Sequence, residues 1–354
     1  MQSMKKLYLL IIFFNCLNVR AQWVQIEEPD SSDLCFRAIQ FPAKDTGFVA
    51  NHNGIYKTVD GGVSWIYTNI EGSFSKIDFI GVDTGIVCCG ITGGENLIRT
   101  YNGGETWQFP SQFYIVAQDV ELLPNGDIFM VENAGDVLLH HFTDFYNNYV
   151  DSEFWQGYGN DIDFPSENIG YISGYIDNFD SASVVIRSFD GGFNWYNTLP
   201  SADGPENEIS FPTPEIGYGR GHVKNQIWKS TDSGFTWELL PFEFRPDLDP
   251  IAVSIVKIYF FNDTVGYAGI QTFPEPFVYH YQVFRTMDGG VSWDSTSFSE
   301  DDIGPTDIYC TDPLTCYLTT CGGGIYKTTN GGGNLDTTII INQLNEVNPL
   351  KSLN

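Results

Sequence analysis

The chain has 354 residues, of which 42% are hydrophobic and 15% aromatic, and its formal net charge is −28 at pH 7. So acidic a surface repels phosphate backbones and anionic lipid surfaces, which excludes nucleic acid as a partner. The same charge is typical of a solvated extracellular protein.

The first 21 residues predict a cleaved secretory signal peptide. Lys5 and Lys6 form a basic start, residues 7–14 are an uninterrupted apolar run, and Val19-Arg20-Ala21 places small residues at the −3 and −1 positions. The apolar run is less than half of the ~20 residues that a membrane span needs. We therefore expect an exported protein, secreted or at the cell surface, that begins near Gln22 and inserts no segment into a membrane.

Removing residues 1–21 takes away three basic residues and no acidic one, which leaves 14 basic and 45 acidic residues and a net charge of −31. Six cysteines remain, and they are Cys35, Cys88, Cys89, Cys310, Cys316 and Cys321. In an exported protein an even number permits disulfides without fixing their pairing.

An eight-residue segment recurs six times, and we call it the box. Its first copy reads Thr58-Val59-Asp60-Gly61-Gly62-Val63-Ser64-Trp65, and the later copies begin at residues 100, 188, 230, 286 and 328. Successive copies are 42, 88, 42, 56 and 42 positions apart, so one unit lacks a recognisable box. The signature residues are Asp60, Trp65, Asn102, Trp107, Asp190, Trp195, Asp232, Trp237, Asp288, Trp293 and Asn330.

Two apolar strands precede each box. The first ends in an aromatic residue and the second opens with glycine and an aromatic residue, as in Ile39-Gln40-Phe41 and Gly47-Phe48. The unit without a box, from Asp119 to His140, brings the count to seven. Each unit predicts four short strands, and units of ~40–45 residues with four strands are typical of propeller blades. We expect an all-β, seven-bladed propeller of antiparallel blades over residues 22–336, followed by a C-terminal tail or linker over residues 337–354.

The boxes have a structural explanation. The Asp or Asn accepts backbone N–H groups in a tight turn, the glycines supply left-handed backbone, and the Trp packs against the preceding hairpin. A basic residue precedes every box, and the six are Lys57, Arg99, Arg187, Lys229, Arg285 and Lys327. A basic residue repeated at one position predicts a local pairing.

The last box has lost its tryptophan, whereas the mature chain opens with Gln22-Trp23-Val24. A propeller must join its first and last blades or leave sheet edges open. We predict that Trp23 replaces the missing tryptophan and that residues 23–26 complete the last blade. A strand over residues 337–341 is the alternative.

The box resembles the Asp-box (BNR) repeat of sialidases, sortilin-type receptors, xyloglucanase-type glycosidases and photosystem II assembly-factor-type propellers. Over residues 23–335 the chain is most similar to the assembly-factor-type and sortilin-type propellers, and the resemblance implies the fold without one activity. The polar tail, residues 345–354, is similar to the spacer before the sorting domain of type 9 secretion substrates. The Tyr-Pro-Asn-Pro run that opens that domain is absent, so either the chain is truncated or the likeness is accidental.

Function is expected on the face opposite the boxes, which we call the upper face. Two long loops are predicted there, over residues 242–250 and 271–282. This aromatic surface with scattered polar groups suits a glycan or a peptide, although tolerated insertions explain such loops equally well. The candidate ligand-binding residues are His52, Arg220, His222, Arg245, Tyr279, His280 and Tyr281.

The preferred function is therefore a non-catalytic, monomeric propeller that binds an extracellular protein or glycan. A sialidase-like or xyloglucanase-like glycoside hydrolase is the alternative. Sialidases need an arginine cluster, but the Arg-Ile-Pro segment typical of them is missing. A carboxylate pair near the propeller axis is the other route to hydrolysis, although bonding between blades explains these acids too. The acids in question are Asp78, Asp161, Asp163, Glu208 and Asp307.

No metal, cofactor or catalytic residue is assigned. The five histidines lack the spacing of zinc ligands, and no twelve-residue calcium loop occurs. Cys310 and Cys316 face each other across the first hairpin of the last unit, which predicts a disulfide.

Overall fold

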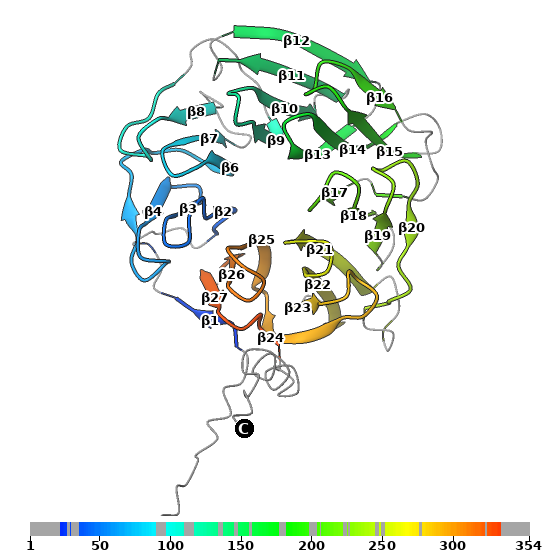
Figure 1. Cartoon of the computed structure of the whole chain (residues 1–354). Coiled ribbons are helices and arrows are strands. Elements are labelled where there is room, and N and C mark those ends of the chain that lie inside the picture. The colour runs from blue at the N-terminus through cyan, green and yellow to red at the C-terminus, as the bar shows by residue number, and fades with distance from the viewer. Residues whose placement is uncertain are drawn as a thin grey trace, which may run out of the picture.

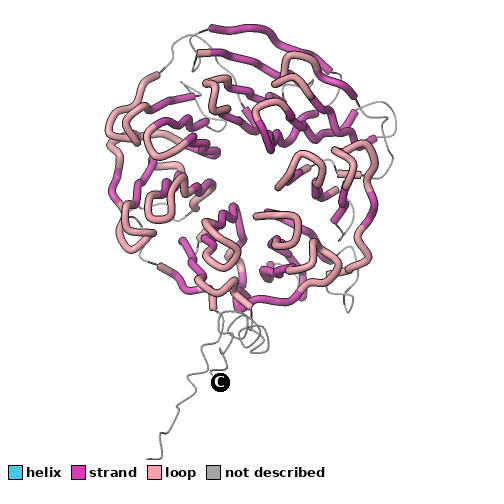
Figure 2. Tube along the Cα trace, viewed as in Figure 1, coloured by secondary structure: helices cyan, strands magenta, loops and turns pink. Residues whose placement is uncertain are grey.

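The computed structural model describes residues 22–26, 29, 35–89, 97–109, 117–133, 137–144, 148–155, 158–176, 182–197, 204–205, 207–221, 225, 227–244, 248, 252–275, 278–322 and 324–333. Seven antiparallel sheets form a ring, and one edge strand of each sheet lies nearest the axis (Figure 1). The described elements are all strands joined by loops (Figure 2). The all-β, seven-bladed propeller predicted from the repeats is confirmed.

Blades 1 to 3 span residues 38–155. Blade 1 contains β2 (Ala38–Gln40), β3 (Gly47–Ala50), β4 (Ile55–Thr58) and β5 (Ile66–Tyr67). Blade 2 contains β6 (Phe74–Ile80), β7 (Thr84–Cys89) and β8 (Leu97–Thr100), and an isolated bridge from Arg99 to Gln108 continues it outward. Blade 3, which lacks a box, contains β9 (Ala117–Leu122), β10 (Ile128–Asn133), β11 (Val137–Thr143) and β12 (Asn148–Trp155).

Blades 4 to 7 complete the ring. Blade 4 contains β13 (Tyr158–Ser166), β14 (Ile169–Ile176), β15 (Ala182–Ser188) and β16 (Trp195–Asn197). Blade 5 contains β17 (Glu208–Ser210), β18 (Gly217–Arg220), β19 (Ile227–Ser230) and β20 (Glu238–Leu239). Blade 6 contains β21 (Val253–Phe260), β22 (Gly266–Glu275), β23 (Val278–Thr286) and β24 (Asp294–Asp301). Blade 7 contains β25 (Gly304–Cys310), β26 (Cys316–Cys321), β27 (Ile325–Thr328) and β1 (Val24–Gln25).

The N-terminal strand closes the ring, as predicted. β1 pairs antiparallel with β27, with Val24 opposite Lys327. Trp23 is only 4% exposed and packs edge-on against Tyr267 at 6.1 Å. A disulfide between Cys35 and Cys321 adds a covalent link between the start of blade 1 and blade 7. The alternative strand over residues 337–341 lies outside the described residues.

The boxes of blades 1, 4, 5 and 6 form the tight turn between the third and fourth strands. In the first copy, Thr58 Oγ1 accepts the N–H of Gly62 at 2.9 Å, and Asp60 Oδ1 accepts the N–H of Ser64 at 2.9 Å. Gly61 and Gly62 have φ angles of 70° and 87°, a region that favours glycine. The boxes of blades 4, 5 and 6 repeat these bonds. The turn thus satisfies its own backbone groups.

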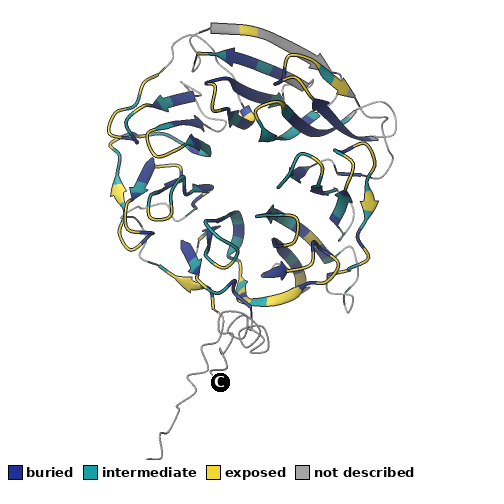
Figure 3. Ribbon diagram, in the orientation of Figure 1, coloured by how far each residue is buried: buried dark blue, intermediate teal, exposed yellow. Residues whose placement is uncertain are grey.

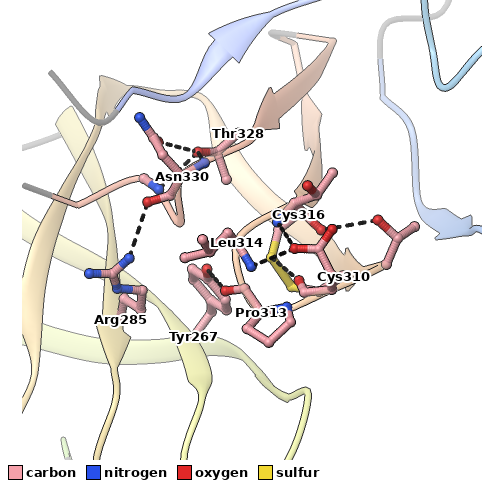
Figure 4. The surroundings of a disulfide bond; sticks show 12 residues. Tyr267, Arg285, Cys310, Pro313, Leu314, Cys316, Thr328 and Asn330 are labelled. Atoms are coloured by element: carbon pink, nitrogen blue, oxygen red, sulfur yellow. Dashed lines mark hydrogen bonds between the residues drawn. A yellow bond between two sulfur atoms is a disulfide. The ribbon is translucent and has the colours of Figure 1, made fainter. Parts of the chain in front are cut away.

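An aromatic ring at the end of the first strand lies over the glycine that opens the second. A Cβ on Gly47 would lie 2.6 Å from the Phe41 ring, so this position cannot carry a side chain without a shift. The box tryptophan packs edge-on against the same ring, as Trp65 does against Phe41 at 6.3 Å. Blade 7 has the predicted Cys310–Cys316 disulfide at these two positions instead (Figure 4).

Neighbouring blades are joined by aromatic stacks and by the basic residues before the boxes. Tyr218 of blade 5 stacks on Phe260 of blade 6 at 3.5 Å between ring centroids. Lys57 donates to the Gly103 carbonyl of the next box at 2.7 Å, and Arg285 donates to Asn330 at 3.3 Å (Figure 4). These pairs repeat around the ring. The second strands are mainly buried and the inner strands combine buried with half-buried residues, whereas many box turns and outer strands are exposed (Figure 3).

Candidate functional site

The inner strands place alternate side chains toward the propeller axis, because successive residues of a strand point to opposite faces. The box follows the third strand, so in an antiparallel blade the inner strand also ends on the box face. Earlier residues of each inner strand therefore lie nearer the upper face. This upper tier contains Lys76, Asp119, Asp161, Glu208, Lys257 and Asp307. The lower tier, nearer the boxes, contains Gln40, Asp78, Glu121, Asp163, Ser210, Tyr259 and Tyr309.

Most of the axial carboxylates accept a backbone N–H of the inner strand of the next blade. The bonds run from Leu122 to Asp78 (2.6 Å), Ile162 to Asp119 (3.2 Å), Ile209 to Asp161 (2.9 Å), Phe211 to Asp163 (2.6 Å), Ile258 to Glu208 (2.8 Å) and Ile39 to Asp307 (3.0 Å). Each bond satisfies a donor at a blade boundary, where an unpaired N–H is costly. The acids considered above as candidates for a catalytic carboxylate pair therefore form hydrogen bonds that join neighbouring blades.

Three cations balance part of this charge in the upper tier. Lys76 lies 2.9 Å from Asp119 and 3.9 Å from Asp161. Lys257 bridges Glu208 at 2.7 Å and Asp307 at 2.9 Å. Arg220, expected to be a ligand-binding residue, pairs with Glu208 at 3.0 Å and donates to the Ile255 carbonyl at 3.2 Å. Its side chain thus belongs to this axial network.

The seven lower-tier residues named above include no lysine or arginine, and the pKa values of their three carboxyl groups are raised. Burial raises the pKa of Asp78 to about 6, although hydrogen bonds from Leu122 and Gln40 oppose the shift. Burial also raises the pKa of Asp163 to about 7, and burial with the charge of Asp78 raises the pKa of Glu121 well above its usual value. Burial acts to raise the pKa of Asp119 too, but the charge of Lys76 together with hydrogen bonds from Asp161, Lys76 and Ile162 outweighs it, and the pKa of Asp119 is lowered.

The longest second strand among the described residues is β22, which forms the β22–β23 hairpin of blade 6 on the upper face. β22 has 10 residues, whereas the corresponding β3 and β18 have four each. Because β22 starts at the same glycine position, the extra residues extend about 20 Å toward the upper face at ~3.3 Å per residue. The prediction of a loop over residues 271–282 is therefore wrong, because most of this segment is a β-hairpin whose cross-strand pairing continues through Thr272 opposite His280.

Two candidate residues lie near the tip of this hairpin, where Tyr279 is exposed and His280 is half-buried. Tyr279 is 42% exposed and packs edge-on, at 5.0 Å between ring centroids, against Phe273, which is also 42% exposed. His280 contacts Asp301 through Nδ1 at 2.7 Å and Ser299 through Nε2 at 3.1 Å. The aromatic pair and the polar triad therefore lie at the same end of the hairpin, on opposite faces of the sheet because Tyr279 and His280 are consecutive in β23.

The other candidates are dispersed. Tyr281 packs into the core between blades 6 and 7, so only part of it faces solvent. His52 is exposed in the turn between β3 and β4 of blade 1, with blade 7 between it and the hairpin (Figure 1). His222 and Arg245 lie outside the described residues, as does most of the predicted loop over residues 242–250.

Four axial residues were not among the residues predicted from the sequence, namely Lys76, Asp119, Glu121 and Lys257. They occupy the same alternating positions as the predicted acids, in Lys76-Ile77-Asp78 and Asp119-Val120-Glu121, so the pattern was present. Among the described residues, no group of three or more His, Cys, Asp or Glu side chains is arranged to hold a metal ion. None of the described residues forms a helix long and apolar enough to cross a membrane.

The fold and its axial bonds define the chain as a seven-bladed β-propeller. Two solved structures of YCF48 share it. The one described as bound to D1 peptide has a TM-score of 0.63 and 14% identity, covering 87% of this chain and 96% of that one. YCF48 from Cyanidioschyzon merolae has a TM-score of 0.64 and 13% identity, covering 88% and 99%.

A GH74 xyloglucanase from Xanthomonas campestris is also similar, with a TM-score of 0.62 and 13% identity. The match covers 88% of this chain and 54% of the xyloglucanase. No family model and no curated protein matches the sequence. At these identities the similarity establishes the fold alone.

Proposed function

We propose that this chain is an exported, non-catalytic propeller that binds a protein or glycan ligand through the blade 6 hairpin on its upper face. The exposed pair Phe273 and Tyr279 is the observation that carries the proposal. Exposed aromatic rings beside polar groups are typical of surfaces that bind peptides and sugars. The contacts of His280 with Asp301 and Ser299 add hydrogen-bonding groups at the same end of the hairpin.

A peptide is the ligand we favour. One similar propeller, YCF48, is described as bound to a peptide. The outer sides of the hairpin are paired with β21 and β24 as far as Thr272 and His280, so a peptide would contact mainly the side chains at its tip. The disulfides Cys35–Cys321 and Cys310–Cys316 support export, because such bonds persist in oxidising compartments. N-terminal sequencing of the exported protein is expected to give Gln22; retention of residues 1–21 would contradict export by cleavage.

Ligand selection with a random peptide display library and a glycan array tests the site. The purified propeller is expected to select a family of ligands, and Phe273→Ala with Tyr279→Ala is expected to weaken binding at least about tenfold. Tyr196→Ala is the matched control, since Tyr196 is 55% exposed on the outer strand of blade 4. Equal loss in the control, or no loss in the hairpin variant, would exclude this site.

The alternative is a secreted glycoside hydrolase, and the raised pKa of Asp163, about 7, is the observation that favours it. A carboxyl that keeps its proton near neutral pH can act as a general acid. Assays with fluorogenic glycosides separate the two functions. We expect no turnover. Turnover that Asp163→Asn or Asp161→Asn abolishes would replace the binding proposal with the hydrolase.

A further inference from the structure

A second exposed surface lies on the box face, over blades 4 and 5. Phe189, Phe193 and Phe235 occupy solvent-facing positions of the two boxes and are 41, 59 and 58% exposed. A fully covered phenylalanine buries 150–250 Å², so these rings leave about 300 Å² accessible. That area is at the lower end of the range of about 300–600 Å² for the largest apolar patch on a typical monomer, and such patches commonly mark interaction sites.

Buried side chains support the rings from below. Arg187 is 5% exposed and lies 3.4 Å from the centre of the Phe235 ring, whose plane is nearly parallel to that of Phe189 at 6.1 Å. In blade 3 His141 takes the register position of the basic residue, opposite Phe129. It is also 5% exposed, and Phe193 packs edge-on against it at 5.3 Å. The three rings therefore stand on a packed layer.

Acidic side chains adjoin these rings. Asp190 and Asp232 are exposed in the same two boxes. Burial acts to raise the pKa of each, but hydrogen bonds within the turn outweigh it, so the pKa values are lowered and the groups stay charged at neutral pH. Glu167 and Glu215 are exposed in adjoining turns, and the Glu215 carbonyl accepts the N–H of Ser233 at 2.9 Å.

We propose that Phe189, Phe193 and Phe235 form a docking surface for a basic partner segment, in which lysine or arginine alternates with aliphatic residues. Aliphatic side chains cover the rings, while the cations interact with ring faces and with the surrounding carboxylates. A second copy of this acidic chain would bring like charges together. The surface lies on the opposite face from the blade 6 hairpin and is independent of it.

Fluorescence anisotropy with a labelled peptide of alternating lysine, leucine and serine tests the proposal, beside the same peptide with glutamate for lysine. The lysine peptide is expected to bind and the glutamate peptide is not. The double variant Phe189→Ser, Phe193→Ser is expected to weaken binding about tenfold. Glu167→Gln with Glu215→Gln is expected to weaken it as well and to reduce its salt dependence.

Val63→Ser is the matched control, because Val63 is 66% exposed at the position of Phe193 in the box of blade 1. It is expected to leave the affinity unchanged, as is Phe273→Ala with Tyr279→Ala. Circular dichroism and thermal unfolding establish that each variant is folded. Absence of binding to the lysine peptide, unchanged binding by the phenylalanine variant, or an equal loss in Val63→Ser would overturn the proposal without touching the hairpin site.

Discussion

Trp23 Nε1 donates a hydrogen bond to Thr296 Oγ1 at 3.1 Å and so joins residues 273 positions apart. Thr296 itself donates to the Val283 carbonyl at 2.7 Å, and Ser297 Oγ accepts the Trp23 N–H at 2.8 Å. The closing strand is therefore anchored to blade 6 as well as to blade 7. Trp23 therefore contributes to ring closure beside the β1–β27 pairing and the Cys35–Cys321 disulfide.

Replacing Trp23 with alanine is expected to destabilise the propeller by about 3 kcal/mol, since a large buried side chain and its hydrogen bond are lost together. The loss should at least equal that of Trp65→Ala, because Trp65 is less buried. Urea unfolding followed by tryptophan fluorescence measures both. Val24→Ala is the control, at 52% exposure; a Trp23 variant as stable as this control would refute anchoring by the tryptophan.

The Cys310–Cys316 disulfide takes the place of the phenylalanine and glycine of other blades. The double variant Cys310→Phe, Cys316→Gly is therefore expected to remain folded, because the new ring meets no Cβ. Cys310→Phe alone is expected to be less stable, since a Cβ at the glycine position of blade 1 would lie 2.6 Å from the ring. Thermal unfolding of both variants tests this expectation. A single variant as stable as the double variant would show that the Cys310–Cys316 pair is not equivalent to the phenylalanine–glycine pair of other blades.

Asp163→Asn is expected to stabilise the protein at pH 8 and not at pH 4. Burial raises the folded-state pKa of Asp163 from 3.8 to about 7, so the folded protein holds a proton that the unfolded chain releases. Stability from this group therefore falls as pH rises from about 4 to about 7. At 1.36 kcal/mol per pKa unit the upper limit is about 4 kcal/mol, and at least about 1 kcal/mol is expected. Urea unfolding at both pH values tests this. A variant less stable than the wild type at pH 8 would mean that the Phe211 hydrogen bond needs the charge.

Asp60→Asn is expected to leave stability at pH 6 nearly unchanged and to flatten its pH dependence in acid. Hydrogen bonds from Ser64 and Thr58 lower the pKa of Asp60 from 3.8 to about 2. The depressed folded-state pKa contributes stability above about pH 4 that is lost as pH falls toward 2. Asn102 already makes the equivalent bonds, to Thr106, in the box of blade 2. Denaturant unfolding between pH 2 and 6 checks this, and an unchanged acid slope would contradict it.

Local features were predictable because the residues that make them are close in sequence. The box turn is built from contacts between residues two and four positions apart, such as Thr58 with Asp60 and Asp60 with Ser64. A recurring local pattern therefore gives the blade count directly. The closing strand could also be predicted, since one blade lacked a tryptophan that the N-terminus supplied.

Contacts around the ring were decided only by the tertiary structure. Cys35 and Cys321 are 286 positions apart, and Glu208 of blade 5 meets Lys257 because the adjacent blade 6 brings that lysine to the same point of the axis. The sequence indicated Arg220 as a candidate ligand-binding residue, and it assigned no role to the box phenylalanines. Which charges are neutralised at the axis, and which rings gather at the surface, depends on the angle between neighbouring blades, which no local pattern encodes.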